Sequence, residues 1–153
     1  MKRIIALLLA LTMIFALCGC ASKETTDTKN KNEYDIVVVD CAIAWETPDF
    51  VFIKPRVHNC TDMDAAYLAL NCALIGVGGR TIRVTQCDTG GVAAGANEWV
   101  SGTIQISKDE LSKLVELQFS GGGFDIRKDD GKLYRQTVTF AEVSFSKGYV
   151  FGD

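Results

Sequence analysis

The fold of this chain is decided by residues 67–84, YLALNCALIGVGGRTIRV, which have the pattern of two strands joined by a glycine turn. Apolar side chains occupy alternate positions in the first half, the period of a strand with one buried face, at Leu68, Leu70, Cys72 and Leu74. The following Gly76-Val77-Gly78-Gly79 contains residues that tolerate a positive φ and permit a tight reversal. Alternation resumes at Ile82 and Val84. The segment therefore predicts an antiparallel strand pair.

The same alternation continues upstream of this segment. A first run has its apolar frame at Val37, Val39, Cys41, Ile43 and Trp45. A second run has it at Val51, Ile53 and Val57, and Pro55 within it predicts an edge strand or a bulge. On this pattern Trp45 is expected to lie in the core. Both runs are predicted to be half-buried strands.

Alternation also continues downstream. A fifth run at Val100, Ile104 and Ile106 is expected to kink at Gly102, and further runs cover residues 115–119 and 124–127. Asp129-Asp130-Gly131 predicts a hairpin turn before a last strand over residues 133–145. The apolar frame of that strand shifts between Phe140 and Val143, which predicts a bulge or a crossing between sheets. About seven short strands separated by turns indicate an all-β, antiparallel sandwich.

One short helical turn is expected near residues 108–114. Ser107-Lys108-Asp109-Glu110 has the spacing of a capping box, in which the serine and glutamate side chains each bond a free backbone N–H. Leu111 and Leu114 follow on one face of that turn.

The start of the chain has the layout of a signal peptide. Lys2 and Arg3 precede an apolar run over residues 4–17, which is shorter than the roughly 20 apolar residues of a spanning helix. The run ends at Leu17-Cys18-Gly19-Cys20, which resembles the lipobox of bacterial lipoproteins. The resemblance implies cleavage before Cys20 and lipid on its sulfur. An ordinary cleaved secretory peptide and a retained helix are the alternatives.

This interpretation divides the chain into three parts. Residues 1–19 are the predicted signal peptide, residues 20–33 the lipidated cysteine and a flexible polar tether, and residues 34–153 the sandwich domain. Residues 22–33 contain no apolar side chain, so they cannot bury surface to offset the entropy of ordering. Removing Lys2 and Arg3 lowers the formal net charge from −3 to −5. An acidic domain does not suit nucleic acid, so we expect attachment to the membrane through the lipid on Cys20.

A second resemblance covers residues 52–61, FIKPRVHNCT. The step Val57-His58-Asn59-Cys60-Thr61 is similar to the Val-x-Asn-x-Thr step of FxLYD-type domains of bacterial surface lipoproteins. The Tyr-Asp ending of their third strand is absent, because Leu74-Ile75-Gly76 stands there. The resemblance implies an immunoglobulin-like sandwich, and it supplies no ligand.

Four cysteines remain in the predicted mature domain, since Cys18 lies in the leader and Cys20 carries the lipid. Four cysteines allow three pairings. If the second to fourth strands form a meander, Cys60 pairs with Cys87 and Cys41 with Cys72. Alternatively, the inward-facing Cys41 and Cys72 are small buried apolar residues.

No catalytic or metal-binding constellation stands out. Asp88-Thr89-Gly90 matches the aspartic-protease tripeptide, but that chemistry needs a second such aspartate, and a turn is the expected role. His58, the only histidine, has no specified Ser or Asp partner. Asp62 and Asp64 could hold calcium weakly but are expected to form a polar turn. We therefore expect no enzyme activity, no metal and no cofactor.

Two classes of function remain open. The first is a lipid-anchored protein at the extracytoplasmic face of the cell membrane, serving as a non-catalytic binding module for protein, peptide or glycan. Its partner would be an envelope protein or an extracellular ligand, bound through exposed aromatic residues, for which Trp99, Tyr67 and Tyr134 are candidates. The alternative is a structural or assembly component of the envelope that self-associates along an edge strand.

Overall fold

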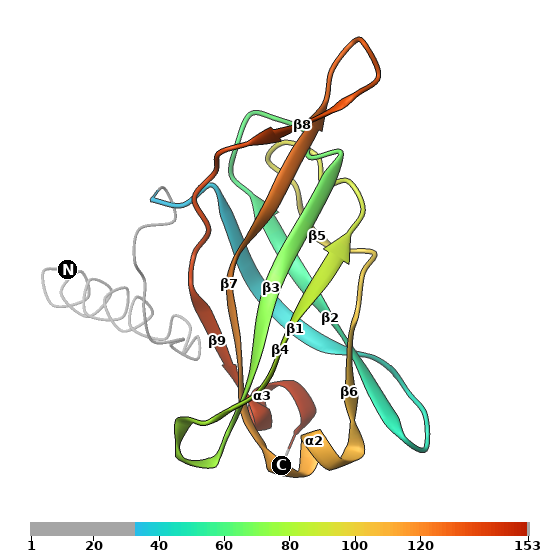
Figure 1. Ribbon diagram of the computed structural model, residues 1–153, viewed down its shortest axis with the longest axis vertical. Helices are drawn as coiled ribbons and strands as arrows, with labels where there is room; N and C mark the ends of the chain where they lie inside the picture. Colours follow the sequence, from blue (N-terminus) through green and yellow to red (C-terminus); the bar gives the residue numbers. More distant parts are fainter. Residues whose placement is uncertain (1–32, 153) are drawn as a thin grey trace, which may run out of the picture. The chain divides into compact units, whose positions relative to one another are not determined.

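A computed structural model describes residues 33–152, which form an all-β sandwich of two antiparallel sheets (Figure 1). The predicted fold class is confirmed. The signal peptide, the lipidation site at Cys20 and almost all of the tether lie outside the described residues.

The first sheet is built around β2. It contains β1 (Ile36–Glu46), β2 (Phe50–Asn59), β5 (Asn97–Trp99) and β6 (Ile104–Ser107). β1 pairs with one side of β2, and the two short strands β5 and β6 pair in turn with its other side. β1 is therefore an edge strand of this sheet.

The second sheet is built around β3 and β7. Its strands are β3 (Tyr67–Gly76), β4 (Thr81–Thr89), β7 (Leu114–Arg127), β8 (Leu133–Gln136) and β9 (Val143–Ser146). β3 pairs with β4 and β7, and both β8 and β9 pair with β7. The glycine turn between β3 and β4 is present as predicted and contains the short 3-10 helix η2 (Val77–Gly79).

The core lies between the two inner faces. Its side chains come from both sheets and include Val38, Cys41, Val51, Ile53, Val57, Leu68, Leu70, Cys72, Leu74, Ile106, Leu117, Phe119 and Phe124. The predicted inward frames of β2 and β3 are therefore confirmed.

Two short helices cap one end of the sandwich. α2 (Lys108–Lys113) begins as predicted, with the Ser107 hydroxyl accepting from Glu110 N at 3.2 Å and Glu110 Oε2 accepting from Ser107 N at 2.9 Å. α3 (Lys147–Phe151) was not expected. Its N-cap is Ser146, whose hydroxyl accepts a hydrogen bond from Tyr149 N. Figure 1 shows both helices at the same end of the domain.

The strand count differs from the expectation of about seven. The described residues contain nine strands. The run over residues 100–106 contributes only β6, and β5 just before it was not expected. The run over residues 133–145 is divided into β8 and β9, whereas the runs over residues 115–119 and 124–127 form the single strand β7. Between β8 and β9 the chain leaves the second sheet, and Phe140 forms an isolated bridge with Ile36 of β1. The phase shift near Phe140 thus marks a crossing toward the first sheet.

The position of Pro55 corrects a second expectation, because β2 is a central strand and not an edge. β5 pairs with residues 56–58 of β2 and β6 with residues 50–53, so Pro55 lies opposite the segment that joins β5 to β6. The carbonyl of Pro55 accepts from Val100 N in that segment at 3.1 Å. Proline removes a ladder donor. Here the ladder is already interrupted at that point, so the missing N–H is tolerated.

The expected meander of strands two, three and four is also wrong. β2 belongs to the first sheet, whereas β3 and β4 belong to the second. The link from β2 to β3 therefore crosses between the sheets. Asn59, at the end of β2, is fully buried and holds this link, because its side chain bonds the backbone of Met63, Val92 and Ala93. The Val-x-Asn-x-Thr step thus has a structural role here.

Candidate binding surface

A cluster of three aromatic side chains, Trp45, Phe50 and Phe52, lies on the β1–β2 hairpin, which projects beside β6 and α2 in Figure 1. Trp45 and Phe52 are cross-strand partners, and their rings stack with centroids 4.6 Å apart and planes 18° apart. Phe50 packs against Phe52 at 6.4 Å. Half of the surface of Trp45 remains exposed (50%).

The burial pattern of β1 corrects the expected inward frame: Ile36 and Val38 are buried in place of Val37 and Val39, and Trp45, expected in the core, is exposed. The pairing of β1 with β2 shifts register twice, once between Val38 and Asp40 and again between Ile43 and Trp45. Each shift inserts an extra residue and reverses the alternation of the strand. Trp45 therefore faces the same side as Phe52, whose neighbours along β2 point into the core.

Beside the aromatic cluster, the outer surface of the first sheet continues onto β6 with polar side chains. Gln105 is the β6 partner of Phe52, and Ser107 is the partner of Phe50, so both face the outer side. Beyond β6, Arg83 reaches over from β4 of the second sheet. Phe50, Gln105, Ser107, Arg83 and Glu110 line an open pocket there. We call the row formed by Trp45, Phe50, Phe52, Gln105 and Arg83 the hairpin face.

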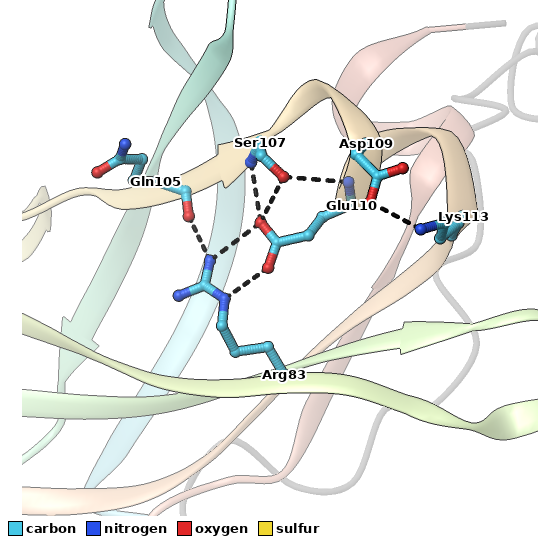
Figure 2. Close-up of polar contacts among 6 residues, drawn as sticks. All are labelled: Arg83, Gln105, Ser107, Asp109, Glu110 and Lys113. Atoms are coloured by element: carbon cyan, nitrogen blue, oxygen red, sulfur yellow. Dashed lines mark hydrogen bonds and ion pairs between the residues drawn. The ribbon is translucent and has the colours of Figure 1, made fainter.

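Arg83 is fixed by an ion pair at the edge of the sandwich. Its Nε donates to Glu110 Oε1 at 2.7 Å, and its Nη2 donates to the carbonyl of Gln105. Figure 2 shows the third guanidinium nitrogen, Nη1, pointing away from Glu110, and it has no hydrogen-bond partner within residues 33–152. Because the rest of the side chain is held, Nη1 is a positioned donor at the pocket.

Two ion pairs flank the hairpin face, Arg83–Glu110 and Lys108–Glu46. Burial alone would raise the pKa of Glu110, but hydrogen bonds from Ser107 and Arg83 outweigh it and hold the pKa of this carboxyl below its ordinary value. Lys108 Nζ lies 2.6 Å from Glu46 Oε2 near the tip of the hairpin. The surface therefore combines apolar rings with donors and acceptors and has little net charge.

The three aromatic residues proposed from the sequence lie elsewhere. Trp99 is on β5 and is 42% exposed, with the Arg56 guanidinium 5.7 Å from its ring centroid. The Tyr67 hydroxyl, at the start of β3, donates to Asp88, and this bond raises the pKa of Tyr67.

Tyr134 on β8 is also engaged locally, since its hydroxyl donates to Asp130 at 2.7 Å and Lys128 Nζ lies 4.5 Å from its ring centroid. Trp99 therefore belongs to the first sheet, whereas Tyr67 and Tyr134 belong to the second. The structure does not bring the three together on the hairpin face. The signal that identifies that face is the alternation of Phe50 and Phe52 with the buried residues of β2.

Neither the Cys41–Cys72 nor the Cys60–Cys87 bridge is present in the structure, where Cys41, Cys72 and Cys87 are buried thiols. Burial raises the pKa of Cys72 to about 12 and that of Cys87 to about 11, and it also raises the pKa of Cys41. Cys60 is half-buried. The alternative role, as small buried apolar residues, describes Cys41 and Cys72 as the structure has them.

The other motifs have structural partners. Asp88 and Thr89 of the Asp-Thr-Gly tripeptide are the last residues of β4, which corrects the expected turn. Thr89 is buried and donates to the carbonyl of Leu68 at 2.8 Å, while Asp88 accepts from Tyr67. Asp64 accepts from Ala94 N at 2.8 Å, as expected of a polar turn. Within residues 33–152, no three His, Cys, Asp or Glu side chains gather in an arrangement that could hold a metal ion.

Comparisons with known proteins give no relative. No family model matches the chain, and no curated protein or solved structure matches it either. The lipobox and the FxLYD-type, immunoglobulin-like assignment therefore stay predictions from the sequence.

Proposed function

We propose that this chain is a lipid-anchored extracytoplasmic protein whose sandwich domain is a non-catalytic binding module, and that the hairpin face is its binding surface. The observation that carries the proposal is the stacked Trp45–Phe52 pair, in which half of the surface of Trp45 is exposed to solvent. Aromatic side chains are enriched at binding surfaces because they supply a large contact area at a small entropic cost. A cluster of them on a projecting hairpin fits that use.

The location of the hairpin supports the proposal. β1 begins at Ile36, near the start of the described chain, and its 11 residues run toward the hairpin. A strand of that length extends about 35 Å. With Cys20 as the anchor, the hairpin face would lie at the end of β1 opposite to the tether, where a partner can reach it. None of the helices in residues 33–152 is both long and apolar enough to cross a bilayer.

Self-association along an edge strand was the alternative. The two register shifts in β1 weigh against pairing through that edge, because bulges disrupt the regular ladder that a second strand would need. The Tyr149 hydroxyl also donates to Asp40 at 2.9 Å, which places α3 beside the middle of β1. These features weigh against assembly through β1.

Two measurements test the proposal. Globomycin treatment, or Cys20→Ala, is expected to move the protein out of the detergent phase in phase partitioning; unchanged partitioning would contradict the anchor. Sedimentation equilibrium of the full chain in density-matched detergent is expected to give a monomer over a wide concentration range. A concentration-dependent dimer would support assembly instead.

A further inference from the structure

We infer that the hairpin face binds a neutral glycan chain, with one sugar ring stacked on the open side of Trp45 and the hydroxyls of other sugar units, further along the row, bonded by Gln105 and Arg83. This inference rests on the proposed binding function and names its ligand class. The first argument is shape. Stacking on Phe52 covers one face of the indole, yet half of Trp45 stays exposed. β1 is an edge strand, so within residues 33–152 no further strand covers Trp45 on its outer side.

The second argument is the mixture of chemistry beside the indole. A pyranose ring has apolar C–H groups on its faces and hydroxyls around its rim, so it needs a flat aromatic surface flanked by donors and acceptors. Gln105 supplies both a donor and an acceptor next to Phe52. Arg83 Nη1 supplies a fixed donor at the adjoining pocket, and the Glu110 carboxylate beside it supplies an acceptor.

The third argument is charge. Arg83 and Lys108 are each paired with a carboxylate. Lys54, on the outer side of β2 next to Phe52, makes no ion pair within residues 33–152, and the Asp49 carboxylate at the hairpin tip, also without an ion pair there, balances its charge. The formal net charge of the chain is also negative. A ligand with hydroxyls and no charge matches this surface better than an acidic polysaccharide does.

Two other occupants fit less well. A peptide added as a strand to β1 would meet the register shift between Ile43 and Trp45. A lipid surface would have to accept the hairpin tip, where Asp49 is an exposed carboxylate with no ion pair within residues 33–152. An acidic tip is repelled by anionic headgroups.

The test is native affinity electrophoresis of the full chain in non-ionic detergent, through gels containing laminarin, mannan or xylan as neutral polysaccharides. Gels containing polygalacturonate provide the acidic comparison. We expect at least one neutral polysaccharide to retard the protein. Trp45→Ala is expected to weaken that binding about tenfold, the effect of losing one aromatic stacking contact. Trp99→Ala, which removes the other tryptophan, is the matched control and should change binding less than about twofold.

Gln105→Ala, an exposed change outside the aromatic stack, should weaken binding about threefold and guards against misfolding of the tryptophan variant. Retardation by polygalacturonate alone, by none of the polysaccharides, or equally for wild type and Trp45→Ala would overturn the inference. The proposed function is judged separately, by saturable binding of the labelled chain to isolated cell envelopes. If that binding depends on Trp45 but no polysaccharide retards the protein, the partner is a protein and only the glycan inference fails. If neither binding occurs, both fail.

Discussion

Replacing Asn59 with aspartate tests how the end of the sandwich is held together. Asn59 is fully buried, and its Nδ2 donates to the carbonyls of Met63, Val92 and Ala93 at 2.9, 3.2 and 3.1 Å. Its Oδ1 accepts from the N–H and the hydroxyl of Thr61 at 3.1 and 2.8 Å. Asn59→Asp keeps the shape of the side chain and the acceptor. It replaces the amide donor with an oxygen that faces three carbonyl oxygens.

The expected loss of folding stability follows from replacing this hydrogen-bond donor with an acceptor. Each lost hydrogen bond is worth about 1 kcal/mol, and the amide has two N–H groups to lose. An uncompensated carboxylate adds a desolvation cost, so we expect a loss of at least about 3 kcal/mol near neutral pH. That is a large fraction of the roughly 5–15 kcal/mol stability of a domain.

The cost should also depend on pH. A protonated carboxyl is uncharged and regains one donor, so the variant is least destabilised in acid. Folding then favours the protonated form, which means that stability is lost as the pH rises above the carboxyl's ordinary titration range, by up to about 1.4 kcal/mol per pH unit. The destabilisation by Asn59→Asp should therefore be larger at neutral pH than at mildly acidic pH.

Urea unfolding of the full chain, followed by circular dichroism at both pH values, measures this effect. The control is Asn97→Asp, the same chemical change at an exposed position of β5, which should cost less than about 0.5 kcal/mol. A loss for Asn59→Asp within about 0.5 kcal/mol of that control would refute the assigned hydrogen-bond network, as would a loss that did not grow with pH.

Three further predictions concern other parts of the domain. Burial and the raised pKa values of Cys72 and Cys87, about 12 and 11, should protect both thiols from iodoacetamide in the folded protein at mildly alkaline pH and expose them in urea; modification of the folded protein, detected by mass spectrometry, would contradict the structure. Glu110→Gln should destabilise the domain by about 1 kcal/mol at neutral pH. Because the pKa of Glu110 is lowered on folding, the difference in stability between wild type and variant should vanish as the pH falls through that folded pKa. A difference that stays constant with pH in urea titrations would contradict the ion pair. Gly122→Ala should lower the free energy of unfolding by more than about 3 kcal/mol, since a Cβ there would overlap a backbone carbonyl of β3. The control, Gly131→Ala, is also at positive φ but has open space around it, and should cost only about 1 kcal/mol. Equal losses in thermal or urea unfolding would show that the β3–β7 contact is misplaced.

The parts of the fold that local rules decide could be read from the sequence. The capping box at Ser107 and Glu110 begins a helix where expected, because both partners lie within one turn of the chain. The glycine turn between β3 and β4 is likewise local. The alternation of β3 gives the correct buried face because that strand keeps its phase until its last residues.

The phase of β1 could not be read in this way. Its register shifts arise from pairing with β2, and nothing in the run from Val37 to Trp45 shows where an extra residue is accommodated. Alternation alone therefore placed Trp45 inside. The same limit applies to Pro55, since its neighbours across the sheet, β5 and β6, lie more than 40 positions further along the chain.

The candidate surface was the least predictable part. It joins Trp45 and Phe52 of the hairpin to Gln105 of β6 and to Arg83 of the other sheet. These contacts depend on the crossing of the chain between the sheets, which the expected meander had misassigned. Exposed aromatic residues could be proposed from the sequence, but their grouping required the topology.

The most direct measurement of the central claim uses the two indole N–H signals of the chain in a proton–nitrogen correlation spectrum. Full-length protein in detergent micelles would be titrated with whichever neutral polysaccharide retards it in the gel, or with laminarin if none does. The hairpin face as a glycan site predicts that the Trp45 indole signal shifts progressively and saturates while the Trp99 signal stays in place. Movement of the Trp99 signal alone, or of neither signal, would contradict it.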